Sequence, residues 1–197
     1  MIMSNKINDV IYEKSKCILF NSYCRSATEV LSNLHVCDLE FEGIKFHSSE
    51  QLFFWLRLWG YQIEQSEILR CTTPKEVKKR GAELMKKLGV NAVLERDVPL
   101  LRLAIRVKYN CCKEFRDFLF SHPTQPIVEY AWWGDTTFGC VDKDENLKYD
   151  WDKGYVIGKN VCGRIIMGVR KEVKDYDGKA TTDIPECIVQ EVPQLLF

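Results

Sequence analysis

The sequence predicts an α+β fold, with a single, mainly helical domain that carries a small antiparallel sheet. Short, partly alternating apolar runs in the first quarter of the chain have the pattern of strands. Apolar residues recur at helical spacing through much of the remainder, and two capping boxes mark helix starts. The length of 197 residues suits one well-buried domain and is short for two. We expect the domain to cover residues 1–174, followed by a C-terminal tail over 175–197.

The first predicted elements are strands. Partly alternating apolar runs occupy Cys17–Asn21 and Leu39–Phe46, and Glu42-Gly43 supplies a tight turn inside the second run. We therefore predict a small antiparallel sheet near the start of the chain.

Two helices with clear start signals follow. Ser48 has the pattern of an N-cap with Gln51 three residues later, so a helix is expected over Glu50–Trp59. Apolar side chains cover almost every face of this helix, which predicts a central buried position. A second capping box, Thr73–Glu76, starts a helix that ends at Gly89. The lysine-rich face of this second helix is expected to face solvent.

Three further helices are predicted from apolar spacing. They cover about residues 97–109, 113–120 and 160–174. In the second of them, Phe115, Phe118 and Leu119 are expected to point inward. A short strand at 127–130 and a turn at Trp132–Asp135 are expected after it, and the charged segment 141–152 has the composition of a loop.

Composition excludes several classes of protein. Lys plus Arg and Asp plus Glu both number 28, so no overall field attracts bulk nucleic acid or an anionic membrane. The nine cysteines show no C-x-x-C spacing and predict free thiols instead of a disulfide framework or zinc site. Charged residues near the start disfavour a signal peptide, and no apolar run approaches the roughly 20 residues of a membrane helix. We expect a cytoplasmic protein without a cofactor or metal.

Two familiar motifs fail in detail. The spacing Asp142-x-Asp144-x-Asn146 begins like a calcium loop, but Leu147 stands where the turn requires glycine. The segment from Gly158 to Gly163 has P-loop spacing, yet the next two residues are not the lysine and hydroxyl that bind phosphate and magnesium. Neither a calcium site nor a nucleotide triphosphatase is predicted.

Three segments carry candidate functional groups. They are Glu50 in the first turn of a helix, the turn Trp133-Gly134-Asp135, and the glycine-rich helix start at 158–164. Unpaired N–H groups at helix starts bind anions, and an indole stacks on a base, so together these groups suit a phosphorylated, ribose-bearing ligand. Each also has a structural explanation: helix dipoles stabilise first-turn acids by about 0.3–1 kcal/mol. Asp135 could serve only as a turn former, and Trp133 as a core residue.

The order of these segments resembles the NADAR superfamily, also called YbiA-like. The matching blocks run across about residues 18–172 and are Leu31–Leu34, Phe46–Glu50, Ala104–Tyr109, Trp133–Asp135, and Gly158–Arg164 followed by Val169-Arg170. The resemblance implies an α+β fold dominated by helices. It also implies an N-glycosidase that acts on phosphoribosyl intermediates of riboflavin synthesis or removes ADP-ribose from guanine.

By position, the resemblance implies a set of site residues. Those carried over are Ser32, Asn33, Glu50, Trp133, Gly134, Asp135, Asn160 and Gly163. Glu50 and Asp135 are the expected catalytic acids: Glu50 would act on water and the developing cation, and Asp135 on the ribose hydroxyls or the leaving group. Trp133 would stack on the base, and the asparagines and Gly163 would supply donors. Phosphate would be neutralised by a cation, for which the candidates are Arg57, Lys108 and Arg164.

Three residues depart from the pattern of related members. His47 replaces a usual proline, Phe54 a glutamine and Arg57 a lysine, and a longer acidic insertion precedes Gly158. If the lysine acts through an imine, Arg57 cannot replace it, because guanidinium stays protonated. The alternative is therefore a protein that binds or sequesters ADP-ribose-derived nucleotides, including cyclic signals, without cleaving them. Both hypotheses require Glu50, Trp133 and Asn160 to surround one sugar, whether free or on a guanine in nucleic acid.

Overall fold

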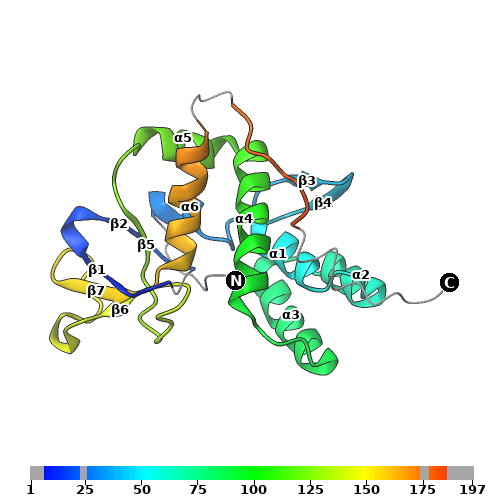
Figure 1. Cartoon of the computed structure of the whole chain (residues 1–197), viewed down its shortest axis with the longest axis horizontal. Helices are drawn as coiled ribbons and strands as arrows, with labels where there is room; N and C mark the ends of the chain where they lie inside the picture. Colours follow the sequence, from blue (N-terminus) through cyan, green and yellow to red (C-terminus); the bar gives the residue numbers. More distant parts are fainter. Residues whose placement is uncertain (1–6, 23–25, 174–177, 186–197) are drawn as a thin grey trace, which may run out of the picture. The chain divides into compact units, whose positions relative to one another are not determined.

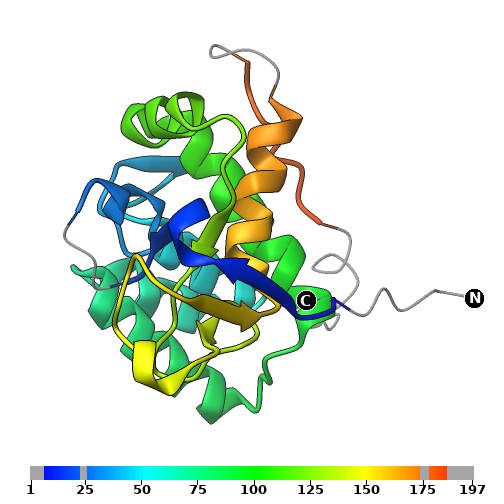
Figure 2. The same cartoon turned by 90° about the vertical axis from the view of Figure 1, so that its left-hand side faces the viewer.

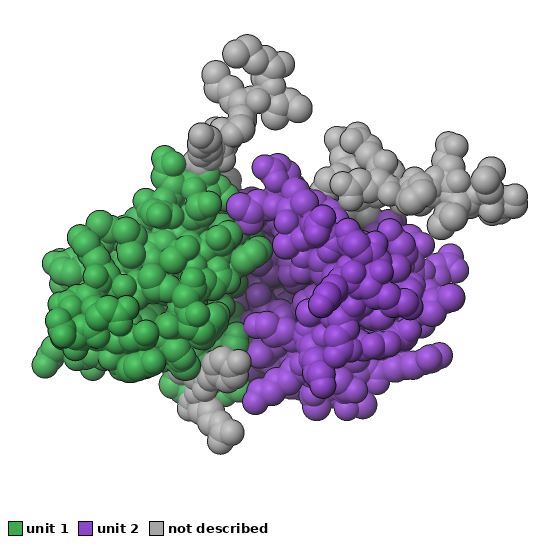
Figure 3. Space-filling model, turned by 90° about the horizontal axis from the view of Figure 1, so that it is seen from below, with its two compact units in different colours: residues 1–32, 122–168 green, residues 33–121, 169–197 purple. Residues whose placement is uncertain are grey.

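The computed structural model, drawn in Figures 1 and 2, describes residues 7–22, 26–173 and 178–185. The chain forms two compact units, coloured separately in Figure 3. Unit 1 contains residues 1–32 and 122–168, and unit 2 contains residues 33–121 and 169–197. Each unit therefore combines segments that are distant in sequence. Within the described ranges, no helix has the length and apolar character needed to cross a membrane.

Unit 1 holds a three-stranded antiparallel sheet and a separate parallel strand pair. Its strands are β1 (Val10–Glu13), β2 (Ile18–Phe20), β5 (Ile127–Glu129), β6 (Val141–Asp142) and β7 (Tyr155–Gly158). The antiparallel sheet has the order β1-β7-β6, and β2 pairs in parallel with β5. Three residues of β2 are all buried, as expected for a strand in a covered parallel pair. The predicted strands at 17–21 and 127–130 are confirmed as strands. The expected antiparallel pairing is wrong for the strand at 17–21, because β2 pairs in parallel with β5, a strand more than 100 residues away in the sequence. Strands β1 and β7 were not predicted.

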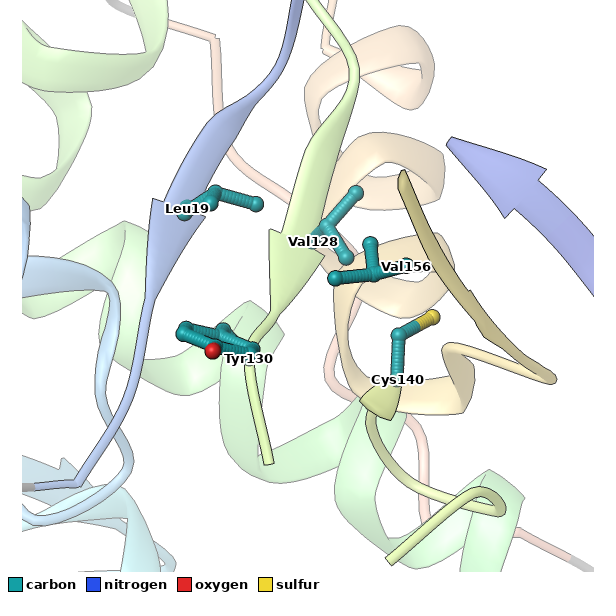
Figure 4. Packing of buried hydrophobic residues seen from close by; sticks show 5 residues of the cluster. All are labelled: Leu19, Val128, Tyr130, Cys140 and Val156. Carbon is teal, nitrogen blue, oxygen red and sulfur yellow. The ribbon is translucent and has the colours of Figure 1, made fainter. Parts of the chain in front are cut away.

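A hydrophobic cluster joins these strands. Figure 4 shows Leu19, Val128, Tyr130, Cys140 and Val156 packed together from β2, β5, β7 and the segment before β6. Partly buried aromatic residues pack around the cluster. The cluster fixes the position of β5. The backbone of this strand bonds to the side chain of Asn160, one of the predicted site residues.

The segment 141–152 is more ordered than predicted. It contains β6 and the 3-10 helix η3 (Glu145–Leu147), so the expectation of a plain loop is wrong there. The cause is Lys14, which is 1% exposed and forms an ion pair with Asp142. Its ammonium also donates to the backbone carbonyls of Leu147, at 3.1 Å, and Asp150. A buried ammonium needs such partners to offset its desolvation, and the partners hold the segment in place.

Unit 2 is built around helices. They are α1 (Ser49–Arg57), α2 (Gln62–Arg70), α3 (Pro74–Leu88), α4 (Leu94–Cys111) and α5 (Lys113–Ser121), together with the antiparallel strands β3 (Leu39–Phe41) and β4 (Ile44–Phe46). Helix α1 packs against α2, α3 and α4 (Figure 1), and residues 49–56 are all buried. The predicted central buried helix is thus confirmed. So is the overall class, an α+β fold that is mainly helical with a small antiparallel sheet.

Both predicted capping boxes form. The amide of Gln51 donates to the Ser48 hydroxyl at 3.2 Å, and the Gln51 side chain accepts from the amide of His47 at 2.9 Å. At α3, the amide of Glu76 donates to the Thr73 hydroxyl at 3.2 Å. The lysines of α3 are all exposed, as predicted for a solvated face. His47 thus supplies an N–H that proline would lack.

Several boundaries differ from the predictions. Helix α4 starts at Leu94, before the expected start near Asp97, so Pro99 lies inside the helix. Proline in a second turn removes one backbone hydrogen bond, and the rest of the helix still packs. Helix α2 was not predicted. Only Gln65 and Ile68 of its residues are buried, so its buried and exposed faces differ little in apolar character. Phe118, expected to point inward, is only half-buried.

Helix α6 (Val161–Glu172) begins in unit 1, and its last residues are counted with unit 2. Glu172 forms ion pairs with Arg102 and Arg106 of α4, both at 2.9 Å. Of the expected tail, residues 174–177 and 186–197 lie outside the described residues. The described part, 178–185, has irregular backbone, and the main chain of Ala180 bonds twice to the Asn110 side chain, each at 2.9 Å.

Candidate functional site

The start of α1 is held by Asn33. The amide of Glu50 donates to the Asn33 carbonyl at 3.0 Å. The Ser49 hydroxyl lies 3.3 Å from both the carbonyl and the side-chain oxygen of Asn33. Ser32, which precedes Asn33, is buried and ends the 3-10 helix η2 (Ala27–Leu31). The Ser-Asn block therefore has a clear structural role in orienting the residue after Ser49.

The Glu50 carboxylate itself is in an unusual environment. Glu50 is 8% exposed, and no hydrogen-bond donor among the described residues reaches its carboxylate. Burial raises the pKa of this carboxyl, while the positive charges of Lys78 and Arg57 oppose the rise. An unbonded, buried acid with a raised pKa is the type of group that accepts or donates a proton in catalysis.

Arg57 is committed to an ion pair. Its guanidinium contacts Asp97 of α4 through two nitrogen–oxygen distances, 3.1 and 2.9 Å, and Asp97 is 1% exposed. The guanidinium also lies 5.6 Å from the ring centroid of Phe54. Burial lowers the pKa of Arg57, and Asp97 opposes that effect. Arg57 acts on Glu50 through its charge, and two of its guanidinium nitrogens bind Asp97.

Phe54 and Lys108 are also packed into unit 2. A Cβ atom on Gly81 of α3 would lie 2.2 Å from the Phe54 ring, so that glycine makes room for the phenylalanine. Lys108 of α4 is fully buried, with its ammonium 4.9 Å from the ring centroid of Phe115. The proposed phosphate role of Lys108 stays a prediction, and the structure places this cation in the interior.

In unit 1, the turn after β5 presents an indole and a carboxylate. Trp133 is 44% exposed, so it is not a core residue, and its ring packs edge-on against Trp132 at 5.4 Å. Gly134 has a φ of 109°, a conformation that favours glycine. Oδ1 of Asp135 accepts from the amides of Thr137 and Phe138, at 2.8 and 2.9 Å. Asp135 is indeed a turn former, and its second oxygen has no bonding partner among the described residues.

The start of α6 satisfies its own N–H groups. The amides of residues 159–162 donate to carbonyls of Thr136, Gly139, Thr137 and Phe138, at 2.7 to 3.2 Å. The expectation of unpaired N–H groups at this helix start is therefore wrong for residues 159–162. The physical reason is the Trp-Gly-Asp turn itself, because Asp135 orders the following loop and that loop provides the carbonyls. The two sequence blocks thus form one structural element.

Asn160 and Gly163 join α6 to β5. The Asn160 side chain donates to the carbonyl of Ile127 at 2.9 Å and accepts from the amide of Glu129 at 3.1 Å. Asn160 is fully buried with a φ of 50°, and a Cβ on Gly163 would lie 2.2 Å from the Ile127 oxygen. These contacts explain both residue types by packing alone. Their predicted role as ligand donors stays a prediction.

Arg164, the third candidate cation, lies at the surface of unit 1. One guanidinium nitrogen donates to the carbonyl of Asn8 at 3.0 Å, and the side chain is partly exposed. The other guanidinium nitrogens have no bonds within the described part of the chain. Of the three predicted phosphate partners, Arg164 has the most donors left for a ligand.

The predicted site residues fall into two groups. Unit 2 holds Asn33, Glu50, Arg57 and Lys108, and unit 1 holds Ser32, Trp133, Gly134, Asp135, Asn160, Gly163 and Arg164. The convergence of Glu50, Trp133 and Asn160 around one sugar joins the two groups and stays a prediction. Across residues 7–22, 26–173 and 178–185, no cluster of three or more metal-ligating side chains could hold a metal ion.

The sequence analysis missed two charged residues, one that acts on Glu50 and one that pairs with Arg57. Asp97 was treated only as a helix-start residue, although it is buried and pairs with Arg57. Lys78 was counted with the solvated face of α3, and it is exposed, yet its charge reaches Glu50. No local pattern connects either residue with position 50, because the link arises from helix packing.

The chain is similar to a protein family and to a solved structure. The family model described as the NADAR domain matches residues 13–174. Among solved structures, the E. coli protein YbiA, determined by NMR, has a similar fold, with a TM-score of 0.54 and 19% sequence identity. The similarity covers 80% of this chain and 85% of that chain, and at this identity it concerns the fold alone. The search of curated proteins yields no match.

Proposed function

Because the chain belongs to the NADAR family, we propose that it is an N-glycosidase. Its substrate class would be an ADP-ribosylated or phosphoribosylated base, such as ADP-ribosyl-guanine or a riboflavin-pathway intermediate. The family is N-glycosidase-like, which supports the reaction type. The observation that carries the proposal is Glu50 at the start of a central helix, a buried carboxylate that no donor of residues 7–22, 26–173 or 178–185 reaches.

The chemistry needs a group with the properties of Glu50. When an N-glycosidic bond breaks, the electron pair leaves with the base, and positive charge develops on the ribose ring. A carboxylate stabilises this charge and takes a proton from the water that attacks C1 of the ribose. A hydrogen-bonded carboxylate would be less basic, whereas Glu50 keeps both oxygens for water and sugar. The proton that Glu50 takes from the attacking water is returned through solvent to the departing base, which leaves neutral and regenerates the carboxylate.

Asp135 and Trp133 fit supporting roles. Since one Asp135 oxygen accepts two amides, the other can accept hydrogen bonds from ribose hydroxyls, and this role suits it better than protonating the leaving group. The exposed indole of Trp133 can stack on the base, an interaction of about 1–3 kcal/mol for bases on aromatic side chains. Arg164 would bind the phosphate. The free thiols of the described cysteines fit a reducing compartment such as the cytoplasm.

Replacing Glu50 tests the proposal directly. Glu50→Gln keeps the shape and removes the base, so the release of guanine from ADP-ribosylated guanosine should slow by about 100-fold or more. Glu95→Gln is the matched control, because Glu95 is an exposed acid in the first turn of α4. Chromatography of the released base measures both rates. An undiminished rate in Glu50→Gln would remove this residue from the mechanism.

A binding protein without turnover is the second candidate. The observation that favours it is α1 itself, which contains no lysine for imine chemistry and whose Arg57 is paired with Asp97 and packed on Phe54. Calorimetry with ADP-ribose, followed by mass spectrometry of the ligand, separates the two functions. Tight binding with the ligand recovered intact supports sequestration, and free base or hydrolysed product supports the enzyme.

A further inference from the structure

A cavity of about 80 Å³ lies in unit 2, between the end of α1 and the start of α4, two helices that pack against each other (Figure 1). Its wall contains two arginines, Arg57 and Arg96, two aromatic residues, Trp59 and Tyr61, and three aliphatic residues. Pockets that enclose a whole ligand of nucleotide size are larger, about 300–1,000 Å³. Since one water needs about 10–15 Å³ of such space, the cavity has room for a group of about five heavy atoms.

The two arginines on the cavity wall share one carboxylate. Nε and Nη2 of Arg57 lie 3.1 and 2.9 Å from the Asp97 oxygens, and Nε and Nη2 of Arg96 lie 3.3 and 3.2 Å from Oδ1 of Asp97. Asp97 is 1% exposed and does not line the cavity. One carboxylate balances only one of two guanidinium groups, so the three side chains together carry an excess positive charge. That charge lies on the cavity wall and favours an anion.

The guanidinium groups are held in place before any ligand binds. The side chains of Arg57 and Arg96 are only 10% and 14% exposed. The Arg57 guanidinium lies 5.3 and 5.6 Å from the ring centroids of Phe53 and Phe54, and Arg96 donates to the carbonyl of Asn91 at 2.6 Å. Side chains that are already ordered lose little conformational entropy on binding, which increases affinity.

Several donors on the cavity wall have no acceptor in the described part of the chain. They are Nη1 of Arg57, the indole N–H of Trp59 and the hydroxyl of Tyr61. Half-buried donors without partners favour a ligand that accepts several hydrogen bonds. A phosphate group provides more acceptor oxygens than a carboxylate, and its five heavy atoms match the size of the cavity.

We propose that this cavity binds a single phosphate group, and that a ribosyl substrate enters with its 5′-phosphate there. The second statement rests on the proposed glycosidase function and selects a phosphoribosylated base over an ADP-ribosylated one. The ADP group is too large for the cavity, and both of its phosphates are linked on two sides. For a phosphoribosylated substrate, the cavity replaces Arg164 as the expected phosphate partner.

The position of Glu50 agrees with this orientation of the substrate. Glu50 and Arg57 lie seven residues apart on α1, which is two helical turns, so both side chains project from the same face. Their backbones are separated by about 10 Å along the helix axis. The phosphate and C1 are at opposite ends of a ribose 5-phosphate. A substrate whose phosphate binds Arg57 can therefore extend its sugar along α1 toward Glu50.

Calorimetry on the full chain at pH 7 tests the ligand class, with ribose 5-phosphate, ribose, orthophosphate and ADP-ribose as the probes. Ribose 5-phosphate should bind at least about 10-fold more tightly than ribose, because ribose lacks the charged group. Orthophosphate should compete with ribose 5-phosphate, and ADP-ribose should bind more weakly than ribose 5-phosphate. Equal affinities for orthophosphate and ribose 5-phosphate would overturn the assignment of the substrate, and so would tighter binding of ADP-ribose.

Two variants test the cavity itself. Arg96→Gln removes one guanidinium and keeps the ion pair of Arg57 with Asp97, so the fold should be retained. Its affinity for ribose 5-phosphate should fall by about 10-fold or more. Tyr61→Phe removes only a hydroxyl that forms no capping bond to α2, and its affinity should fall by about 2–10-fold. Melting temperatures of both variants verify that they are folded.

Arg102→Gln is the matched control. Arg102 is also an arginine of α4 that pairs with a carboxylate, Glu172 at 2.9 Å, but it does not line the cavity. Its replacement should leave the affinity for ribose 5-phosphate unchanged. Unchanged affinity in both Arg96→Gln and Tyr61→Phe would overturn the phosphate site, and an equal loss in Arg102→Gln would do the same.

The outcomes for the phosphate cavity and for the glycosidase can be told apart. Release of base from a phosphoribosylated substrate, without measurable binding of ribose 5-phosphate or orthophosphate, would overturn the phosphate cavity and leave the proposed function intact. Binding that depends on Arg96, in a chain that releases no base, would support the cavity and contradict the glycosidase.

Discussion

The sequence presents the starts of α1 and α6 as equivalent anion sites. In the structure, the polar side chains at these two helix starts differ in their hydrogen bonding. At α6, four carbonyls accept the first amides, and the Asn160 side chain bonds at both ends to β5. At α1, the amides of Gln51 and Glu50 also have acceptors, on Ser48 and Asn33, but the Glu50 carboxylate is buried without a donor among the residues that the structure describes. A polar residue whose bonds are complete stabilises the fold, whereas one whose bonds are incomplete remains available for a ligand.

Residues with similar sequence signals therefore have different roles at the two helix starts. The start of α6 is expected to respond to mutation through stability. The start of α1 is expected to respond through stability at Ser48 and through chemistry at Glu50. The following substitutions test that division, from the largest expected effect to the smallest.

Gly163→Ala should have the largest effect on stability. The added Cβ would lie 2.2 Å from the backbone oxygen of Ile127, and backbone cannot move aside as a side chain can. We expect a loss of about 3 kcal/mol in the free energy of unfolding. Gly81→Ala is the helical control, since its obstacle is the ring of Phe54 and alanine favours helix. Urea denaturation should show a smaller loss for Gly81→Ala, and equal losses would contradict the special closeness of α6 to β5.

Asn160→Ala should come next. It leaves the Ile127 carbonyl and the Glu129 amide without their partner in a buried place and puts alanine at a φ of 50°. The expected loss is about 2–3 kcal/mol, with unchanged ligand affinity per folded molecule. Asn146→Ala, in the exposed η3, should change stability by less than about 0.5 kcal/mol. Retained stability with lost affinity would instead make Asn160 a ligand donor.

Ser48→Ala should cost about 1 kcal/mol, because the amide of Gln51 loses its cap. Thr73→Ala removes the equivalent cap of α3 and should cost about the same. The two variants should differ in catalysis, since only Ser48 orients the turn that carries Glu50. Measuring the melting temperature and base release for both variants checks this. Equal catalytic losses would mean that the cap of α1 has no particular link to the site.

Glu50→Gln should show the smallest change in stability, and its sign depends on pH. Burial raises the pKa of Glu50 above 4.5, so the native state holds its proton more tightly than the unfolded state does. As pH rises from about 4.5 through the raised pKa, the wild type loses stability that the glutamine variant keeps. The variant should therefore melt slightly higher at pH 7 and equally at pH 4. A variant less stable at pH 7 would show that the carboxylate has an undetected partner.

Local signals predicted the helical frame well. The capping boxes at Ser48 and Thr73 located α1 and α3, and Glu42-Gly43 marked the turn between β3 and β4. These features are readable because the interacting groups lie within four residues of one another. Helix α2 escaped notice, since few of its residues are buried. The regular structure within residues 141–152 was also not predicted, because it depends on Lys14 near the start of the chain.

By itself, the sequence determined the α+β class, the main helix starts and the family, because caps, apolar spacing and ordered motifs are local properties of the chain. Only the tertiary structure decided which polar residues use their hydrogen bonds to stabilise the fold. Asn160 and Glu50 are both buried beside helix starts, and nothing local distinguishes their bonding. Whether a hydrogen-bond partner arrives from a distant segment is a property of packing, and within the described part of the chain packing brings no donor to the Glu50 carboxylate.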